Sequence, residues 1–375
     1  MAVKPSLALI PSGVKANKVY SVLPADGTGD FDFSRSGSAT RINKDGLIET
    51  VSSNVSRLNY PMIDGVVSGC PSLLLEPART NLVQYSEDFT SWINSSSYIT
   101  SDYGISPDGS QNASRLLFTG TSQTLSKNIG TNGTLSYSIY VKGVKGETIN
   151  ISMASGSDEN FLLNGEWQRL SYSDTVSNST ININTFGNKT ARDLLIWGVQ
   201  LEVGSYPTSY IPTNGSTVTR DAESCEQTPP SGIIGQTEGT VYADVNFVGV
   251  TEAITNQIFF VREQGSNNGY LFAGFYQGRL NCGMKVGGSL LFDDYFSSAL
   301  TKGRYKIAIS YKSGDTKIYV NGIQTGFKNN SFGVTNFAQI FLNGSAGTNQ
   351  LGDVNRDFKL YNTRLTDQEL IALTS

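Results

Sequence analysis

The sequence contains no histidine among its 375 residues. Ser-His-Asp and Cys-His catalysis need an imidazole that accepts and returns a proton near neutral pH. The commonest zinc and iron sites also use histidine as a ligand. Composition therefore excludes these classes of enzyme and of metal site.

Charge and long hydrophobic runs are also scarce. Charged residues make up 16% of the chain, and 28 basic residues are nearly balanced by 32 acidic ones. Because nucleic-acid binding depends on a basic face, we expect no nucleic-acid partner. The longest apolar runs, such as 72–75 and 194–197, are far shorter than the ~20 residues of a membrane-spanning helix. We therefore expect no membrane insertion, and the absence of an apolar signal segment predicts synthesis in a cytoplasm.

Cysteine is rare. Cys70, Cys225 and Cys282 are odd in number and widely spaced, which fits neither a disulfide framework nor a zinc pattern. We expect three buried free thiols, and the sequence predicts no cofactor.

Glycine and turn-forming pairs are abundant instead. The chain has 39 glycines, and Asn-Gly or Asp-Gly pairs recur along it, for example at Asn132-Gly133 and Asn321-Gly322. Such pairs tolerate the positive φ of two-residue hairpin turns. Short runs between them alternate apolar and polar residues, as in 135–141 and 305–311, which is the pattern of strands. The sequence therefore predicts an all-β fold of sandwiches, with no short repeat that would indicate a propeller or solenoid.

One short helix is expected at the C-terminus. Thr366 and Glu369 have the spacing of a capping box, and Asp367 lies in the first turn, where it complements the helix dipole. Leu370 and Leu373 then share one helix face.

Composition divides the chain into four segments. Residues 1–75 are rich in Gly, Ser and Asp with weak strands, and 76–212 alternate densely. Residues 213–238 contain Pro229-Pro230 and are typical of a linker or strap. Residues 239–375 form a second block of dense alternation.

Three stretches resemble known families. The runs FDFSRSGSATR (31–41), GLIETV (46–51), RLNY (57–60), LLLEPARTNL (73–82) and YSEDFTSW (85–92) resemble a segment of phage head-fibre, head-spike and tail-fibre proteins. The ending WGVQLE (197–202) with PTSYIP (207–212) resembles the last strand and strap of a jelly roll similar to carbohydrate-binding modules. Residues 303–322 and 358–369 are similar to laminin-G or concanavalin-like lectin sandwiches. This lectin pattern often has an aromatic-His pair where this chain has Tyr305-Lys306, so no lectin ligand site is carried over.

The resemblance implies a trimeric fibre or spike on the virion surface. Residues 1–75 would attach to a capsid or tail protein and become ordered there, while two β-sandwiches project outward. Compact size and the absence of a collagen-like or coiled-coil shaft favour a head fibre of the crAss-like phage type over a receptor-binding tail fibre. Trimerisation comes from the resemblance alone, because no heptad pattern is present.

Several carboxylates are candidates for catalytic or metal-binding groups. Glycoside cleavage needs two acids on either side of one bond, and the acids of interest are Glu263, Asp293, Asp294 and Asp315. Neighbouring residues in a strand point to opposite faces, so Asp293 and Asp294 are unsuited to a shared bond. In a loop they would be solvated, or would bind calcium together with backbone carbonyls. We expect no enzyme and no required metal, and calcium remains an alternative.

Aromatic side chains next to polar ones are candidates for contact with a host or mucosal polysaccharide. Most of the 18 Tyr, 18 Phe and 3 Trp must fill cores or trimer contacts, and we expect Trp167 and Trp197 in a core. The candidate glycan-binding residues of the second block are Tyr270, Tyr276, Arg279, Asp293 and Tyr295. Those of the first block are Trp92 and Tyr103.

Three arginines of the attachment segment are candidates for virion contact. Arg35, Arg41 and Arg79 suit an interface because the guanidinium makes bidentate hydrogen bonds to carboxylates. Pairing inside the chain, for instance of Arg79 with Glu76, is the alternative.

These observations leave three hypotheses for function. The first is a virion fibre or decoration protein that adheres to glycans, and the second is a polysaccharide-degrading enzyme of concanavalin-like type. The third is a purely structural decoration without a ligand. The missing histidine and the absence of a suitable acid pair favour the first.

Overall fold

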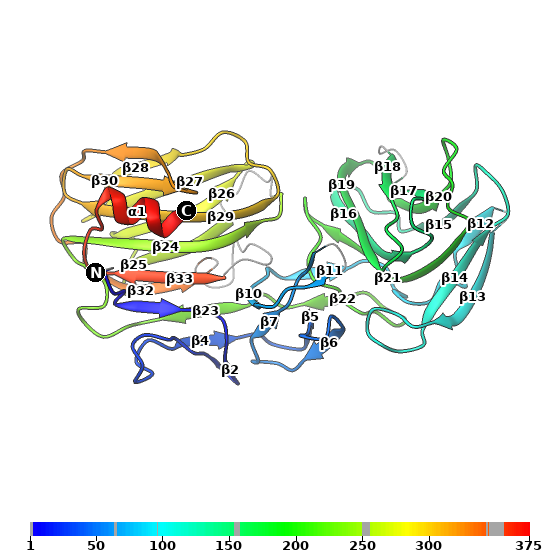
Figure 1. Cartoon of the computed structure of the whole chain (residues 1–375), viewed down its shortest axis with the longest axis horizontal. Coiled ribbons are helices and arrows are strands. Elements are labelled where there is room, and N and C mark those ends of the chain that lie inside the picture. Colours follow the sequence, from blue (N-terminus) through cyan, green and yellow to red (C-terminus); the bar gives the residue numbers. More distant parts are fainter. Residues whose placement is uncertain are drawn as a thin grey trace.

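The computed structural model describes residues 3–63, 66–95, 97–153, 158–249, 256–342, 344 and 356–375. Regular structure in this part is almost entirely β-strand, with one helix, α1 (Asp367–Thr374). Two β-sandwiches lie side by side along the long axis of the molecule, and short strands run between them (Figure 1). The predicted all-β fold of two sandwiches with one C-terminal helix is confirmed.

The sandwich that contains the C-terminus has a six-stranded and a nine-stranded sheet, as far as the chain is described. The six-stranded sheet has the order β1 (Leu7–Leu9), β33 (Asp357–Tyr361), β24 (Glu238–Phe247), β29 (Gly303–Lys312), β30 (Thr316–Val320) and β31 (Ile323–Lys328). The nine-stranded sheet has the order β2 (Val14–Lys15), β3 (Lys18–Val19), β4 (Phe31–Ser34), β23 (Ser224–Gln227), β32 (Phe337–Leu342), β25 (Asn256–Glu263), β26 (Tyr270–Tyr276), β27 (Arg279–Val286) and β28 (Ser289–Tyr295).

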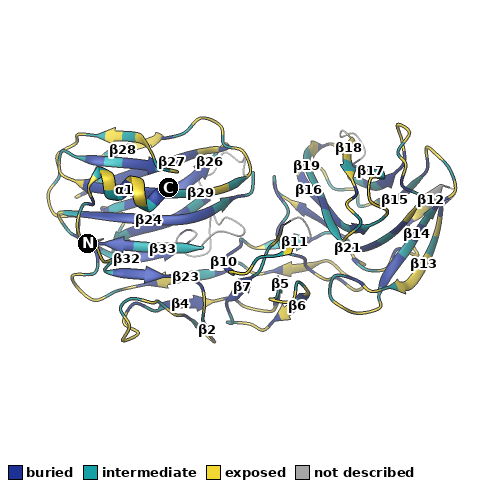
Figure 2. Cartoon of the chain, viewed as in Figure 1, coloured by how far each residue is buried: buried dark blue, intermediate teal, exposed yellow. Residues whose placement is uncertain are grey.

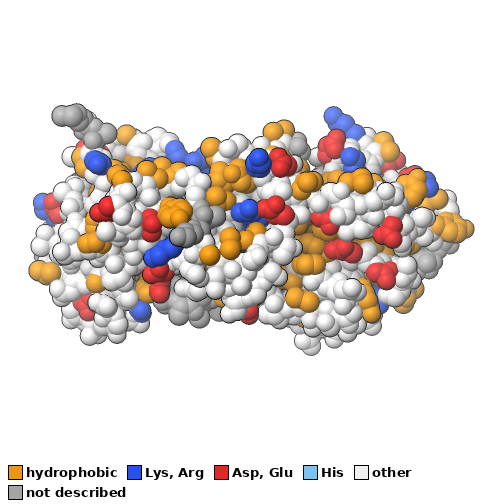
Figure 3. Space-filling view, turned by 90° about the horizontal axis from the view of Figure 1, so that it is seen from below, with side chains coloured by type: hydrophobic (Ala, Val, Ile, Leu, Met, Phe, Trp, Pro, Cys, Tyr) orange, Lys and Arg blue, Asp and Glu red, His pale blue; other side chains and the backbone are white. Residues whose placement is uncertain are grey.

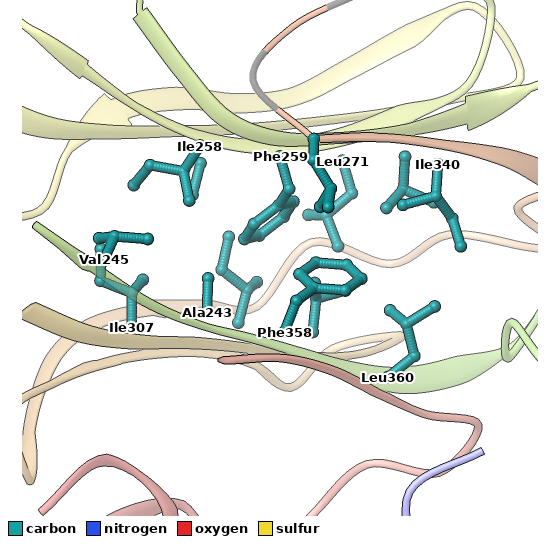
Figure 4. Packing of buried hydrophobic residues seen from close by; sticks show 14 of the residues in the cluster. Ala243, Val245, Ile258, Phe259, Leu271, Ile307, Ile340, Phe358 and Leu360 are labelled. Carbon is teal, nitrogen blue, oxygen red and sulfur yellow. The ribbon is translucent and has the colours of Figure 1, made fainter. Parts of the chain in front are cut away.

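Alternating apolar residues of these two sheets form one core between them. Figure 4 shows Ala243 and Ile307 of one sheet facing Phe259 of the other. Phe358 lies in the middle of this core, with its ring centroid 6.0 Å from that of Phe259. Because successive side chains point to opposite faces of a strand, every second side chain lies in the core and the others lie on the outer face of the sheet.

The second sandwich is a jelly-roll-like pair of five-stranded sheets. The first sheet has the order β12 (Ile93–Ser95), β15 (Thr124–Asn128), β20 (Thr180–Asn184), β17 (Thr148–Met153) and β18 (Asp158–Leu162). The other has the order β13 (Ser97–Gly104), β14 (Ala113–Phe118), β21 (Asp193–Val203), β16 (Gly133–Lys142) and β19 (Gln168–Val176). Their inner faces share a separate hydrophobic core, so each sandwich buries its own apolar surface.

Four two-stranded ladders lie between the sandwiches (Figure 1). They pair β5 (Ala39–Ile42) with β6 (Ile48–Val51), β7 (Arg57–Asn59) with β10 (Ser72–Leu74), β8 (Met62–Ile63) with β9 (Val66–Val67), and β11 (Arg79–Asn81) with β22 (Val218–Arg220). Residues 35–81 and 218–220 therefore form the junction of the molecule.

The observed boundaries differ from the expected segments 1–75 and 213–238. Strand β1 pairs with β33, so that Leu7 lies opposite Leu360. Strand β23 pairs with both β4 and β32, and Cys225 lies opposite Phe33 and Leu342. Strands β1 to β4 and β23 thus belong to the two sheets of the C-terminal sandwich. They are ordered there because short apolar strands satisfy the backbone groups of neighbouring strands in these sheets.

Local predictions on turns and the helix are confirmed. Asn321 and Gly322 have φ of 48° and 80° in the tight turn between β30 and β31. Thr366 caps α1 and forms the expected capping box with Glu369.

The cysteines and tryptophans follow the expectations only in part. Cys225 and Cys282 are buried free thiols, whereas Cys70 is exposed, because it lies in the junction outside either core. Trp197 is buried as expected, but Trp167 is only half-buried: it lies in the loop just before β19 and packs against the small cluster that contains Trp197.

Burial and charge vary along the surface. The centres of the inner strands are buried, while loops, sheet ends and edge strands such as β18 are exposed (Figure 2). Acidic and basic side chains are interspersed on the face that Figure 3 shows. In the described part of the chain, no helix is long and apolar enough to cross a membrane.

Candidate functional site

The structure brings together the five glycan-contact candidates of the C-terminal sandwich. All five lie on three adjacent strands, β26, β27 and β28. The register places Tyr276 opposite Arg279 and Asn281 opposite Tyr295. Core residues alternate with these positions, so their side chains share the outer face of the nine-stranded sheet.

Four of these residues and one neighbour form a compact group that we name the β26–β28 patch: Tyr276, Arg279, Asn281, Asp293 and Tyr295. The rings of Tyr276 and Tyr295 lie 5.8 Å apart at an interplanar angle of 38°. The Arg279 guanidinium carbon is 5.6 Å from the centroid of the Tyr295 ring. Tyr295 is 47% exposed, so an aromatic face beside a cation is available to solvent.

Hydrogen bonding orients the polar side of the patch. Asn281 Nδ2 donates to Asp293 Oδ1 at 2.9 Å and to the carbonyl oxygen of Asp294 at 3.2 Å. Asn281 itself is buried, whereas Asp293 is exposed. The Asp293 carboxylate is therefore held in place and keeps acceptor capacity for a ligand hydroxyl.

Tyr270 lies further along the same face and belongs to an aromatic cluster. Its ring is stacked on Phe260, with centroids 5.6 Å apart, and packs near Phe272. Burial raises the pKa of Tyr270, and the nearby charge of Asp293 raises it further. Tyr270 is half-buried, so its role combines packing with one accessible edge.

Two adjacent carboxylates are separated by the strand geometry, as the sequence predicts. Asp293 faces the patch, whereas Asp294 pairs with Lys328 at 2.5 Å. The two side chains do not converge on one ion, which removes the basis for the calcium alternative. Among the described residues, no group of three acidic or cysteine side chains is placed to hold a metal ion.

The other two aromatic candidates lie in the jelly-roll-like sandwich, away from the patch. Trp92 is 4% exposed and packs against Phe89, with ring centroids 5.2 Å apart. The prediction that it contacts glycan is therefore wrong, because it fills the core of that sandwich. Tyr103 is 53% exposed on β13, and the guanidinium carbon of Arg115 lies 5.1 Å from its ring.

The three arginines expected at the virion interface have partners within the chain. Arg35 is buried and pairs with Glu223 at 2.7 Å, so it is not available to another protein. Arg41 pairs with Glu49 at 2.7 Å and is partly exposed. The Arg79 guanidinium carbon lies 5.5 Å from the Tyr206 ring, and Glu76, its alternative partner, pairs with Arg57 and Arg220 instead.

Arg35 belongs to a buried group at the junction that we name the junction cluster: Arg35, Arg57, Glu76, Arg220 and Glu223. Glu223 accepts from Arg35 Nη1 at 2.7 Å and from Arg57 Nη2 at 2.5 Å. Glu76 lies 2.9 Å from Arg57 Nη2 and 3.0 Å from Arg220 Nη1. These side chains are 0–3% exposed and come from four separate stretches of sequence, so their pairing fastens the junction together.

The electrostatics of the junction cluster are mutually compensating. Burial alone would raise the pKa of Glu76, but Arg220 and Arg57 lower it to about 2. Burial alone would lower the pKa of Arg57, yet Glu223 and Glu76 raise it above its ordinary value. Burial is the dominant effect on Arg35, whose pKa is lowered although Glu223 opposes this.

The jelly-roll strap is tied to the same cluster. Ser209 donates through its backbone N–H to Glu76 Oε1 at 2.7 Å and accepts from Arg57 Nη1 at 2.7 Å. Buried Glu202 accepts from the hydroxyl of Thr208, which in turn accepts from Arg220. Many residues of the phage-like motifs thus form an internal joint, which the sequence alone presented as an attachment surface.

A groove that the sequence did not indicate lies beside this joint. Two adjoining cavities of about 210 and 430 Å³ share five lining residues: Ile42, Ile48, Asn59, Tyr140 and Arg169. The β5–β6 hairpin and residues 59–62 form one wall, and the outer face of the jelly-roll sheet at β16 and β19 forms the other. We name it the junction groove.

Comparisons with known proteins give only distant structural similarity. No protein-family model matches the sequence, and no curated protein is similar to it in sequence at a significant level. The chain is similar to the CBM40 of a Ruminococcus gnavus IT-sialidase bound to α2,3-sialyllactose, with 16% identity over 38% of this chain and 84% of that chain and a TM-score of 0.32.

Two further solved structures show likeness of the same extent. Domain 4 of the Geobacillus stearothermophilus GH43 arabinanase AbnA, in complex with arabinotriose, has 17% identity over 46% of this chain and 82% of that chain, with a TM-score of 0.33. The binding domain of botulinum neurotoxin serotype D/C has 18% identity over 41% of this chain and 40% of that chain, with a TM-score of 0.33.

Proposed function

We propose that the chain is a structural fibre or decoration protein of a phage virion that adheres to glycans without cleaving them. The phage-like motifs at 31–92 support the virion location. The β26–β28 patch supports adhesion, and it is the observation on which this part of the proposal rests.

The patch has the chemistry of a sugar-binding surface. Tyr276 and Tyr295 offer aromatic faces to the apolar side of a sugar ring. Arg279, Asn281 and Asp293 supply donors and acceptors for hydroxyl groups beside these rings. Because all five side chains come from neighbouring strands of one sheet, their spacing is fixed before a ligand arrives, which lowers the entropic cost of binding.

Hydrolysis of the bound glycan is not part of the proposal. Both common mechanisms of glycoside cleavage use two carboxyl groups about 5 to 9.5 Å apart on either side of the bond. Among the described side chains that face outward from β26, β27 and β28, Asp293 is the only carboxylate. With no histidine in the chain, the patch lacks both an acid–base pair and an imidazole.

Weak single-site binding suits a multivalent particle. A homotrimer carrying several patches would hold a polysaccharide through avidity, in which linked sites raise the overall affinity without new contacts. We place the attachment to a capsid or tail protein in the N-terminal region, on its exposed surface and without Arg35. A head fibre is our first choice, and a receptor-binding tail fibre would display the sandwiches in the same way.

A glycan array with the full chain tests the adhesion. We expect binding to at least one class of host or mucosal polysaccharide, and a loss of about tenfold for Tyr276→Ala and for Tyr295→Ala, since 1.4 kcal/mol corresponds to tenfold. Tyr98→Ala is the matched control, because that tyrosine is also exposed, lies on the other sandwich and is not a candidate for glycan contact. A silent array, or equal binding by all variants, would refute the patch as the site.

Location and oligomeric state have their own tests. Light scattering on the purified chain is expected to give the mass of a trimer, and imaging of an intact virion is expected to place the chain on the head. A monomer in solution and on the particle would remove avidity from the proposal.

A further inference from the structure

The junction groove has one wall from the β5–β6 region and one from the jelly-roll sheet. Pro61 and Met62 line the first wall, and Trp167 lines the second. Together its two cavities fall in the range of about 300–1,000 Å³ that small-molecule sites occupy. A ligand in this groove would contact both the jelly roll and the N-terminal region.

Aromatic rings on the jelly-roll wall are fixed by their own contacts. Trp167 Nε1 donates to the carbonyl oxygen of Ile105 at 3.1 Å, and the ring remains half-buried. Tyr140 packs at 5.5 Å against the buried ring of Trp197, which holds it in position. The wall thus offers two oriented rings for stacking, as a sugar site needs.

Arg169 supplies a positive charge beside these rings. Its guanidinium carbon lies 5.5 Å from the Tyr140 ring, and its Nη2 donates to Ser138 Oγ at 2.9 Å. In the described part of the chain it forms no ion pair, and its buried Nε has no hydrogen-bond partner. A half-buried guanidinium with unused donors is suited to an anionic ligand group.

Other charged groups near the groove are already neutralised. Arg41 pairs with Glu49, and Glu76 pairs with Arg57 in the junction cluster. On the opposite wall, Asn59 Oδ1 accepts from the backbone N–H of Ile42 at 2.8 Å, while no contact of its amide nitrogen is among the described hydrogen bonds. Arg169 is therefore the unbalanced charge of the groove, and Asn59 adds a donor across from it.

We infer that the junction groove binds an acidic saccharide, with the carboxylate of the sugar at Arg169 and the ring against Tyr140 and Trp167. This inference rests on the proposed glycan adhesion and gives it a second site with a stated ligand class. The groove offers an unpaired positive charge to its ligand, whereas the β26–β28 patch carries one cation, Arg279, and one carboxylate, Asp293, so their charges offset each other.

Ligand-observed NMR and calorimetry on the full chain test this inference. The probes are the methyl glycosides of glucuronate, galacturonate and N-acetylneuraminate, with methyl glucoside and methyl galactoside as neutral counterparts. We expect at least one acidic probe to bind and the neutral ones to bind at least tenfold more weakly. Arg169→Met is expected to weaken the acidic probe tenfold or more, and Arg169→Lys to recover part of the loss.

Variants at the two sites separate the inference from the proposed function. Trp167→Leu is expected to weaken the acidic probe, whereas Tyr276→Ala is expected to leave it unchanged. Acidic probes that bind equally to wild type and Arg169→Met would overturn the groove as their site while leaving adhesion at the patch intact. If acidic probes depend on Arg169 while no glycan of the array depends on Tyr276 or Tyr295, the patch is overturned and the groove is kept. Near-ultraviolet circular dichroism checks that each variant is folded, and an acidic probe that fails to bind folded wild type refutes the inference.

Discussion

Replacing Glu223 by Gln removes one negative charge from the junction cluster while keeping the side-chain volume. In the wild type this carboxylate accepts from Arg35 and from Arg57, and also from the backbone N–H of Glu76 at 2.9 Å. The variant keeps a hydrogen-bonding group but leaves two buried arginines, Arg35 and Arg57, with fewer carboxylate partners. The free energy of unfolding should fall.

The magnitude follows from which arginine loses its partner. Breaking a buried ion pair by removing one member costs about 3–5 kcal/mol. Arg57 keeps Glu76 at 2.9 Å, whereas Arg35 loses its only carboxylate among the described contacts. Backbone carbonyls of Gly37, Val51, Ser52 and Val55 still accept from Arg35. We therefore expect a loss near the lower end of that range, about 3 kcal/mol.

Urea unfolding provides the assay. Far-ultraviolet circular dichroism follows the whole molecule, and tryptophan fluorescence follows the jelly roll, because Trp92, Trp167 and Trp197 all lie there. Both signals should shift, since Ser209 ties the strap to the cluster. The exposed pair Arg115–Asp193 gives the control, Arg115→Met, with an expected loss below about 1 kcal/mol. A Glu223→Gln loss no larger than the control would refute the joint as a source of stability.

Three further predictions concern stability. The pKa of Glu76 is about 2 when folded against 4.5 as its ordinary value, so its contribution is present above pH 4.5 and is lost as the pH falls towards 2. At 1.36 kcal/mol per pKa unit, this contribution to the free energy of unfolding is about 3 kcal/mol. Urea unfolding between pH 2 and 6 should reveal it, and a free energy of unfolding that does not change with pH would contradict it. Gly283→Ala would place a Cβ 2.3 Å from Phe272 Cε1, so the free energy of unfolding should fall by about 1–3 kcal/mol. A thermal melt measures this, and an unchanged melting temperature would mean that Phe272 moves aside at no cost. Thr366→Ala removes the α1 cap and should lower the free energy of unfolding by about 1 kcal/mol. Thr363→Ala is the control, and equal losses in the two variants would show that the capping box does not stabilise the fold.

Local signals in the sequence were sufficient for the fold class and for part of the site. Asn321-Gly322 specifies its turn through neighbouring residues alone, and the capping box at Thr366 spans one helical turn. The β26–β28 patch was predictable for the same reason, since Tyr276 and Arg279 lie on either side of one tight hairpin.

Long-range pairing was out of reach of such signals. Leu7 pairs with Leu360 across nearly the whole chain, and no periodicity within 1–75 reveals that partner. Arginine is a residue type that is common at interfaces, so the sequence suggested that Arg35 is exposed. Only its hydrogen bond with Glu223, which is 188 residues away in the chain, shows that it is buried. The polar neighbours of Trp92 in the sequence indicate a surface position, but its ring packs against Phe89 in the core of the jelly-roll-like sandwich.

The junction groove was missed because its walls come from distant segments. Tyr140 and Arg169 each alternate with core residues of their strands, so the pattern only says that they face away from the core. What lies opposite them, from Ile42 to Met62, depends on the folding of the N-terminal region over the jelly-roll sheet. Tertiary context, rather than local propensity, creates this site.

Adhesion without chemistry can be tested by incubating the full chain with the polysaccharide that it retains most strongly and following both partners by NMR. We expect saturable binding that weakens when Tyr276 and Tyr295 are replaced together, while the anomeric signals of the polysaccharide stay constant for days. New reducing-end signals that disappear in an Asp293→Asn variant, or retention that is indifferent to the double replacement, would contradict the account.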